Sequence, residues 1–212
     1  MPFILKGELF SIWYVALAVV ASLMVAVVLA NTDLVLTKSA PASLEELGTA
    51  DLQTTTGDVK TVKGRTLWER NGAVILVEAA ELSSLKPQLD ELGVPLHAVV
   101  KEDVGTEIQD FKHRYFNGEI FVDHKRVFYG PKYRRMGLGL GLARLGVLQN
   151  LVYAHRKGYQ GNRNGEGFIL GGLYVIGVEK QGVLLEQREK EFGDKADLSL
   201  ILEAAKKINK SR

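Results

Sequence analysis

The sequence contains no cysteine among its 212 residues. This absence excludes disulfide bonds, thiolate metal sites, cysteine nucleophiles and thiol redox chemistry for the chain as written. It also removes the usual disulfide clue to the cellular compartment. An excess of charge of one sign is missing too, because 27 Lys and Arg residues stand against 25 Asp and Glu residues. The net charge of +2 therefore gives no general reason to expect a nucleic-acid partner.

Two common signatures of enzymes are also absent from the sequence. There is no G-x-S-x-G motif, and Ser83 and Ser84 fall within a predicted helix, so a serine hydrolase has no support. The histidines have no metal-ligand spacing with one another or with carboxylates. We expect them to be surface or structural residues, and we expect no metal and no cofactor; they are His97, His113, His124 and His155.

A glycine-rich segment resembles a nucleotide-binding motif only superficially. Gly137, Gly139 and Gly141 form G-x-G-x-G, whereas a dinucleotide fingerprint requires G-x-G-x-x-G directly after a strand. The preceding residues 131–135 do not resemble a strand. We expect residues 136–153 to form an apolar helix or loop packed on the domain. A contact with a membrane surface is the functional alternative, since the segment follows Lys132, Arg134 and Arg135.

An uncharged, apolar run of 22 residues extends from Leu9 to Ala30. As a helix it would be about 33 Å long, enough for a hydrocarbon core of about 30 Å. Trp13 and Tyr14 near one end are typical of an interfacial anchor. A membrane anchor, a cleaved signal peptide and an apolar helix docked on the domain remain open. Lys6 and Lys38 flank the run and leave its orientation undecided; we divide the chain into residues 1–33 and a domain of residues 34–212.

Helix-like and strand-like segments alternate after the apolar run. We expect strands at 73–77, 96–100 and 119–122, and a long one at 168–178 that pairs back with 182–186. We also expect 126–129 to form a hairpin with 119–122. Leucines at helical spacing predict a helix over 82–92 that Pro87 kinks or restarts and Gly93 ends, and a last helix covers 198–208. This order favours an α/β fold with a thioredoxin-like sheet and helices on both faces.

The junction between Val77 and Glu78 is physically unusual. The predicted strand that ends at Val77 meets the following helix with essentially no loop, although such connections usually take about 2–6 residues. The chain must turn out of the sheet before it can pass back over the face. The sequence therefore indicates that a connection is missing at this point.

Seven blocks of the sequence resemble the peroxiredoxin-like 2 family. They are NGAVIL (71–76), LSSLKPQLDELGVPL (82–96), AVVKE (98–102), GEIFVD (118–123), FYGP (128–131), GEGFILGGLYVIG (165–177) and QGVLLEQREKEFGD (181–194). The resemblance extends over residues 34–208, and the last two blocks are long enough to be specific. It implies a thioredoxin-like fold and an antioxidant, redox-regulatory role.

The resemblance also implies where the chemistry of the family would lie. Its two cysteines, in a C-x-x-C arrangement, would fall between Val77 and Glu78, where about ten residues are absent. We therefore expect no thiol peroxidase or disulfide reductase activity and no catalytic residue on this chain. The alternatives are a non-catalytic, membrane-tethered binding or regulatory module and a prostaglandin F synthase-like reductase, which would also need thiols. The family implies a thiol reductant or regulatory protein as partner and a cytoplasmic location, with secreted or membrane-associated forms as alternatives.

Overall fold

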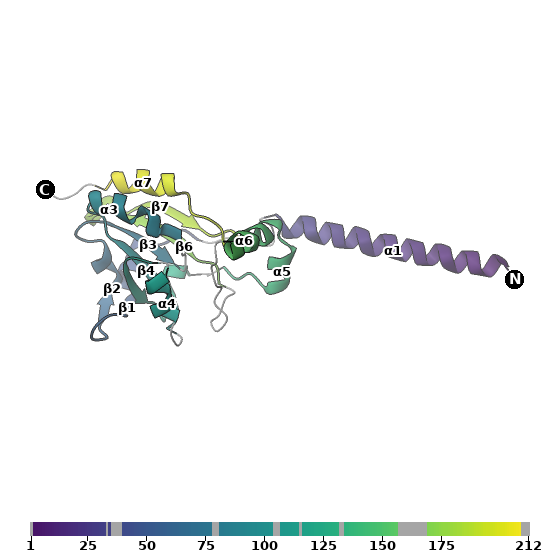
Figure 1. Cartoon of the computed structure of the whole chain (residues 1–212), viewed down its shortest axis with the longest axis horizontal. Helices are drawn as coiled ribbons and strands as arrows, with labels where there is room; N and C mark the ends of the chain where they lie inside the picture. The colour runs from purple at the N-terminus through teal and green to yellow at the C-terminus, as the bar shows by residue number, and fades with distance from the viewer. Residues whose placement is uncertain are drawn as a thin grey trace.

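A mixed seven-stranded sheet forms the centre of the computed structural model, which describes residues 2–32, 34, 40–77, 81–103, 107–114, 116–131, 134–156 and 169–208 (Figure 1). The strand order is β2-β1-β5-β4-β3-β6-β7. The three strands β5, β4 and β3 are parallel, and every other pairing is antiparallel. The strands are β1 (Asp51–Thr54), β2 (Thr61–Lys63), β3 (Ala73–Val77), β4 (Leu96–Val100), β5 (Glu119–Val122), β6 (Gly172–Ile176) and β7 (Val183–Arg188).

Helices cover both faces of this sheet, as the thioredoxin-like expectation requires. The α-helices are α1 (Pro2–Ala30), α2 (Leu44–Thr49), α3 (Lys86–Glu91), α4 (Glu107–Arg114), α5 (Leu138–Ala143), α6 (Leu145–Arg156) and α7 (Leu198–Lys206). Short 3-10 helices are η2 (Gly64–Leu67), η3 (Glu81–Leu85), η4 (Val127–Tyr129) and η5 (Glu179–Gln181). The α/β fold class and the apolar N-terminal helix are confirmed.

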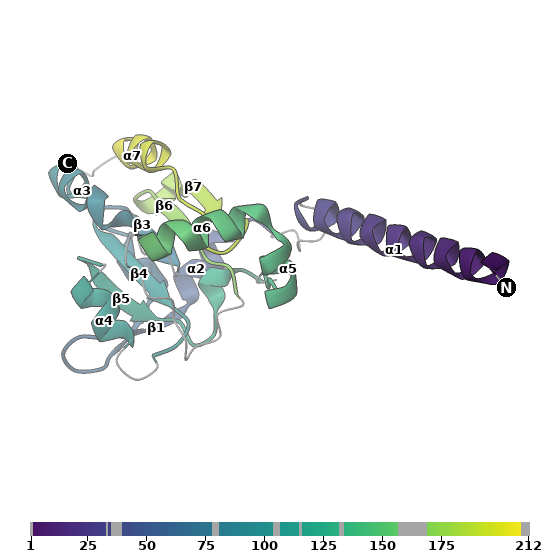
Figure 2. The ribbon, with the colours of Figure 1, turned by 45° about the vertical axis from the view of Figure 1, so that its right-hand side comes forward.

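Two hydrophobic cores, one on each face, bury the central strand β3 completely. Side chains alternate along a strand, so Val74 and Leu76 face one core while Ala73, Ile75 and Val77 face the other. The first core contains residues of α3 and α7, which lie side by side (Figures 1 and 2). The second contains residues of α2, η2 and η4. This double burial explains why β3 is a continuous apolar run rather than an alternating one.

The helix expected over 82–92 is restarted at its proline. A 3-10 turn over Glu81–Leu85 precedes α3, and Pro87 lies in the first turn of α3. Proline fits there because the first N–H groups of a helix have no intrahelical partner. Gly93 ends α3 with a φ of 61°, and the N–H of Gly93 donates to the carbonyl of Asp90 at 2.8 Å. Both parts of the prediction are confirmed.

The expected hairpin of 119–122 with 126–129 is wrong. The chain forms β5 as predicted, but it then turns at Arg126, whose φ is 59°, and enters η4. The Asp123 carboxylate accepts a hydrogen bond from the N–H of Phe128 at 2.8 Å and closes this turn. Antiparallel β1 takes the place beside β5 that the hairpin strand would have occupied. Neither β1 nor β2 was expected, because both are short and largely polar.

The other strand predictions hold with one change of length. The strand expected at 168–178 is reduced to Gly172–Ile176, and Phe168 lies outside the described residues. Ile169 instead makes a single bridge with Arg135. The chain then returns through η5 into β7, which pairs with β6 as expected. Within the segment 136–153, for which a helix or a loop was expected, the chain forms α5 and the greater part of α6, separated at Arg144.

The apolar helix α1 projects away from the sheet, and α5 and α6 lie at its inner end (Figure 2). Within it, Ile12–Ala30 is long and apolar enough to cross a membrane, and its side chains are almost all exposed. The alternative of a helix docked on the domain along its length is therefore wrong. The division of the chain after residue 33 stays a prediction, because Asp33 lies outside the described residues.

Candidate functional site

The candidate site lies at the C-terminal end of the central strand β3. Val77 is the last residue of β3, and it pairs with Val99 of β4 on one side and with Gly172 of β6 on the other. Gly172 pairs in turn with Arg188, the last residue of β7. Glu78, before which the missing C-x-x-C segment was expected, lies outside the described residues. The predicted position between Val77 and Glu78 therefore stays a prediction.

Arg188 is the main charged group near this end of β3. Its side chain is only 9% exposed, and its Nε donates to Oε1 of Glu186 at 2.7 Å. Nη1 donates to the carbonyl oxygen of Phe128 at 3.1 Å, and the guanidinium lies 4.9 Å from the centre of the Tyr174 ring. Nη2 is buried and has no hydrogen-bond partner among the residues that the structure describes. Since a buried N–H without an acceptor is costly, this nitrogen can bind an anion or a carbonyl oxygen.

Two glycines leave the space that the Arg188 side chain occupies. A Cβ on Gly130 would lie 3.2 Å from Nη2 of Arg188, and a Cβ on Gly172 would lie 3.1 Å from its Cδ. Gly130 also has a φ of 83°, which other residues rarely adopt. Side chains at these positions would push the guanidinium away from Phe128 and Tyr174. Arg188 was not predicted as a site residue, because it lies two residues beyond the strand expected at 182–186 and belongs to no motif.

Tyr174 and Asp123 hold the loop that carries Phe128. The Tyr174 hydroxyl donates to the Phe128 carbonyl oxygen at 2.9 Å, and burial raises the pKa of Tyr174 well above its ordinary value. Burial likewise raises the pKa of the Asp123 carboxyl, although the Phe128 N–H, among other backbone N–H groups, opposes the shift. Tyr174 therefore remains a neutral donor. Both side chains position the carbonyl that Arg188 binds.

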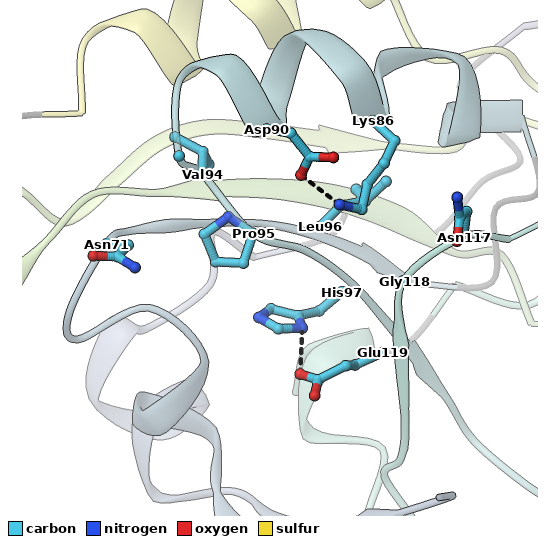
Figure 3. Close-up of a pocket in the computed structure, with 11 residues that line it drawn as sticks. Asn71, Lys86, Asp90, Val94, Pro95, Leu96, His97, Asn117, Gly118 and Glu119 are labelled. Atoms are coloured by element: carbon cyan, nitrogen blue, oxygen red, sulfur yellow. Dashed lines mark hydrogen bonds and ion pairs between the residues drawn. The ribbon is translucent and has the colours of Figure 1, made fainter.

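A second group of polar residues lines a cavity of about 450 Å³ near the opposite ends of the strands, where β4 and β5 begin (Figure 3). Nδ1 of His97 lies 3.4 Å from Oε2 of Glu119, and its ring meets Phe121 edge-on. Burial is the main cause that lowers the pKa of His97. Lys86 and Asp90, which also line this cavity, form an ion pair with each other. The cavity can admit a small polar molecule, but its charged side chains already have partners.

The four histidines differ in their exposure. His97 is buried in β4, as expected for a structural residue, while the other three side chains are exposed. His124 makes a hydrogen bond of 2.9 Å with Gln53. Among the described residues, no group of three His, Asp or Glu side chains is placed to hold a metal ion. Gly137, Gly139 and Gly141 lie at and within α5 rather than between a strand and a helix.

Comparisons with known sequences find close relatives over most of the chain. The sequence model of a family described as AhpC/TSA antioxidant enzyme matches residues 81–191. The chain is 60% identical over 207 residues to Peroxiredoxin-like 2A of Danio rerio, covering 92% of this chain and 97% of that protein. It is 55% identical to the Gallus gallus protein of the same name, with 92% of each chain covered. The Rattus norvegicus protein is 51% identical over 221 residues, which cover 98% and 96% of the two chains.

These alignments are longer than the part of this chain that they cover. In the Danio rerio comparison, 92% of the 212 residues is about 195 residues, whereas the alignment has 207 positions. The relative therefore has residues at about 12 positions where this chain has none. Among solved structures, peroxiredoxin Q of Xanthomonas campestris matches with a TM-score of 0.44 at 12% identity and covers 80% of this chain and 97% of its own.

Proposed function

Because this chain belongs to the peroxiredoxin-like 2 family, we propose that it is a redox-regulatory protein whose thiol chemistry is missing from this cysteine-free form. The family is antioxidant in character and has the thioredoxin-like sheet described above, so a redox-related role follows from membership. The observation that carries the rest of the proposal is the complete absence of cysteine. A thiolate is the nucleophile in peroxide reduction and in disulfide exchange, and this chain has none.

The missing residues belong, in this proposal, directly after Val77. The strands on both sides of β3 retain continuous pairing up to Val77, and the next described residue, Glu81, begins a 3-10 helix rather than a longer α-helix. A block inserted here would supply both a connecting loop and a first helical turn. Thiolates at such a helix N-terminus are stabilised by free N–H groups and by the helix dipole. The deficit of about 12 positions in the alignment is of the size that this block requires.

A peroxide-consumption assay on the purified full-length chain tests the loss of activity. With a dithiol reductant and hydrogen peroxide, we expect the same rate for the native chain and a heat-inactivated sample. Peroxide consumption above that control would contradict the proposal, since no thiol on the chain can account for it. The assay needs no variant, because the chain as given contains no cysteine.

The intact mass of the protein from its natural source tests the position of the missing block. Fragment sequencing across Val77 and Glu78 would either read these two residues as neighbours or reveal an insertion. About ten additional residues with two cysteines would identify the native protein as a thiol redox enzyme. Direct adjacency of the two residues would support a regulatory role without thiol catalysis.

A second candidate function is a membrane-tethered binding or regulatory module. It is favoured by the exposure of the apolar helix α1, whose span Ile12–Ala30 would leave a large apolar surface in water. We expect the full chain to float with lipid vesicles and to resist extraction at alkaline pH. The double substitution Leu17→Arg and Leu23→Arg places two charges in the span and should abolish flotation. Val59→Arg, at an exposed site between β1 and β2, is the matched control and should float like the native chain.

A further inference from the structure

Charge is distributed unevenly along this nearly neutral chain. Residues 125–165 contain nine Lys and Arg residues and no Asp or Glu. The rest of the chain consequently carries 18 basic residues against all 25 acidic ones. The helices α5 and α6 lie inside the basic stretch, and α6 ends in Arg156, whose side chain is exposed. Arg144 of this stretch is buried and paired with Glu191, whereas Arg135 and Arg156 are exposed near the two ends of the α5–α6 segment and suit it to a negatively charged surface.

Large apolar side chains are exposed on α5 and α6, and the exposed polar residues of α6 are Gln149, His155 and Arg156. Five side chains that are 41% to 63% exposed form what we term the leucine face: Leu142, Leu145, Leu148, Leu151 and Val152. The last four recur at positions i, i+3, i+6 and i+7 of α6, which places them on one side of the helix. A contiguous apolar helix face with basic residues at its borders is characteristic of a helix that lies in a membrane interface.

The opposite side of the same helix is held by the domain. Val147 is buried against Met136 and Leu170, and Nδ2 of Asn150 donates to the carbonyl oxygen of Phe192 at 3.1 Å. These contacts determine which side of α6 points outward. The exposure of the leucine face is thus a property of the folded domain.

Polar contacts connect the leucine face to the end of the apolar helix α1. Nδ2 of Asn31 donates to the carbonyl oxygen of Ala143 at 3.0 Å, and Oδ1 of Asn31 accepts from the N–H of Leu145 at 2.9 Å. Arg144 is buried, and its Nη1 donates to the carbonyl oxygen of Ala30 at 3.0 Å while its Nε pairs with Glu191 at 2.7 Å. The end of α1 therefore lies at the level of the α5–α6 junction (Figure 2).

We propose that the leucine face of α5 and α6 lies in the interface of an anionic membrane, beside the point at which α1 leaves it. The inference rests on the membrane tether proposed above and goes beyond it by assigning a second contact surface. If α1 crosses the bilayer, its end at Ala30 lies at the membrane surface, and the contacts of Asn31 and Arg144 hold the junction of α5 and α6 at the same depth. The leucines then enter the acyl boundary while the basic residues face lipid headgroups.

The absence of native cysteine makes a direct test practical, because each single-cysteine variant carries one label. Full-length Leu148→Cys and Leu151→Cys report on the leucine face, Val20→Cys on α1, and Val59→Cys on a distant exposed site. Each is labelled with an environment-sensitive fluorophore. The labelled proteins are reconstituted in phosphatidylcholine vesicles, with or without phosphatidylserine, that contain lipids brominated in the acyl chains.

We expect labels at positions 148 and 151 to be blue-shifted and quenched several-fold more than the label at position 59, with stronger quenching when phosphatidylserine is present. If position 20 is quenched but 148 and 151 behave like 59, the leucine face is not in the membrane and only this inference fails. If 148 and 151 are quenched but 20 is not, the tether through α1 fails together with the placement of the leucine face beside it, and only the contact of that face with lipid stands. Loss of quenching at all three positions overturns both.

If a second copy of the chain, rather than lipid, covers the leucine face, the fluorescence result is different. It would shift the emission of labels at positions 148 and 151 in a way that depends on protein concentration and not on brominated lipid. That outcome would overturn the membrane assignment and identify the leucine face as a contact between two protein molecules.

Discussion

Replacing Arg188 by methionine tests the candidate site most directly. The Arg188 side chain is 9% exposed, its Nε lies 2.7 Å from Oε1 of Glu186, and its Nη1 donates to the Phe128 carbonyl oxygen. Breaking a buried ion pair by removal of one partner costs about 3–5 kcal/mol. Methionine also removes the buried Nη2, which has no acceptor among the described residues and whose burial is unfavourable by about 1–2 kcal/mol. We therefore expect Arg188→Met to lower the free energy of unfolding by about 2–3 kcal/mol.

Urea unfolding of the full chain in detergent, followed by tryptophan fluorescence, measures this change. Trp68 is a suitable reporter because it is buried in the same hydrophobic core as Phe128 and Tyr174. The midpoint should fall while the dependence on urea stays the same. Lys125→Met is the matched control, since Lys125 is an exposed partner of Asp51 at 2.9 Å, and we expect no measurable change.

A double-mutant cycle separates the ion pair from other effects of the substitution. Glu186→Gln retains an oxygen that can accept from the N–H of Ala42, as Oε2 of Glu186 does at 3.0 Å. The variant with both substitutions should be less destabilised than the sum of the single variants, because it no longer contains an unpaired buried charge. A loss for Arg188→Met below about 0.5 kcal/mol, with additive effects in the cycle, would refute the view that this pair is buried and coupled.

Three further predictions follow from single positions. Gly72 has a φ of 64°, and a Cβ there would lie 2.7 Å from the Ile208 side chain, so Gly72→Ala should cost about 2–3 kcal/mol in urea unfolding. Asp197 accepts from the N–H groups of the first turn of α7, so Asp197→Ala should cost about 1 kcal/mol and Asp197→Asn clearly less. Burial lowers the pKa of His97 below 6.5 in the folded chain. As the pH falls, the imidazole is therefore protonated at a higher pH in the unfolded chain than in the folded chain. Stability should fall as pH decreases through 6.5, and thermal unfolding of His97→Gln should show a weaker dependence over that range.

Much of the fold could be predicted because its central elements are locally encoded. The residues of β3 and β4 are short apolar runs, and burial on both faces of the sheet requires such runs. Pro87 and Gly93 mark the restart and the end of α3 through properties of their own backbones. The two strands β1 and β2 escaped prediction, since short strands with mostly polar, partly exposed side chains have no distinctive apolar pattern.

The turn after β5 was predicted wrongly for a different reason. Residues 126–129 include Val127, Phe128 and Tyr129, which have high strand propensity, and local reasoning therefore favours a hairpin. In the structure, the buried Asp123 carboxylate binds the N–H of Phe128, and this bond makes a helical turn instead. A side chain that can bond to the backbone a few residues away competes with strand pairing, and burial strengthens that competition.

The sequence by itself determined the apolar helix α1, the strand β3, and the absence of any thiol, because composition and local periodicity are sufficient for each. Only the tertiary structure decided which carbonyl groups the buried arginine side chains bind. Arg188 meets the carbonyl of Phe128 across 60 residues, and Arg144 meets that of Ala30 across 114. A hydrogen bond requires an acceptor within about 3 Å at a suitable angle, and no pattern along the chain encodes such a meeting between distant segments. Those contacts exist because the packing of the sheet and its helices brings the segments together.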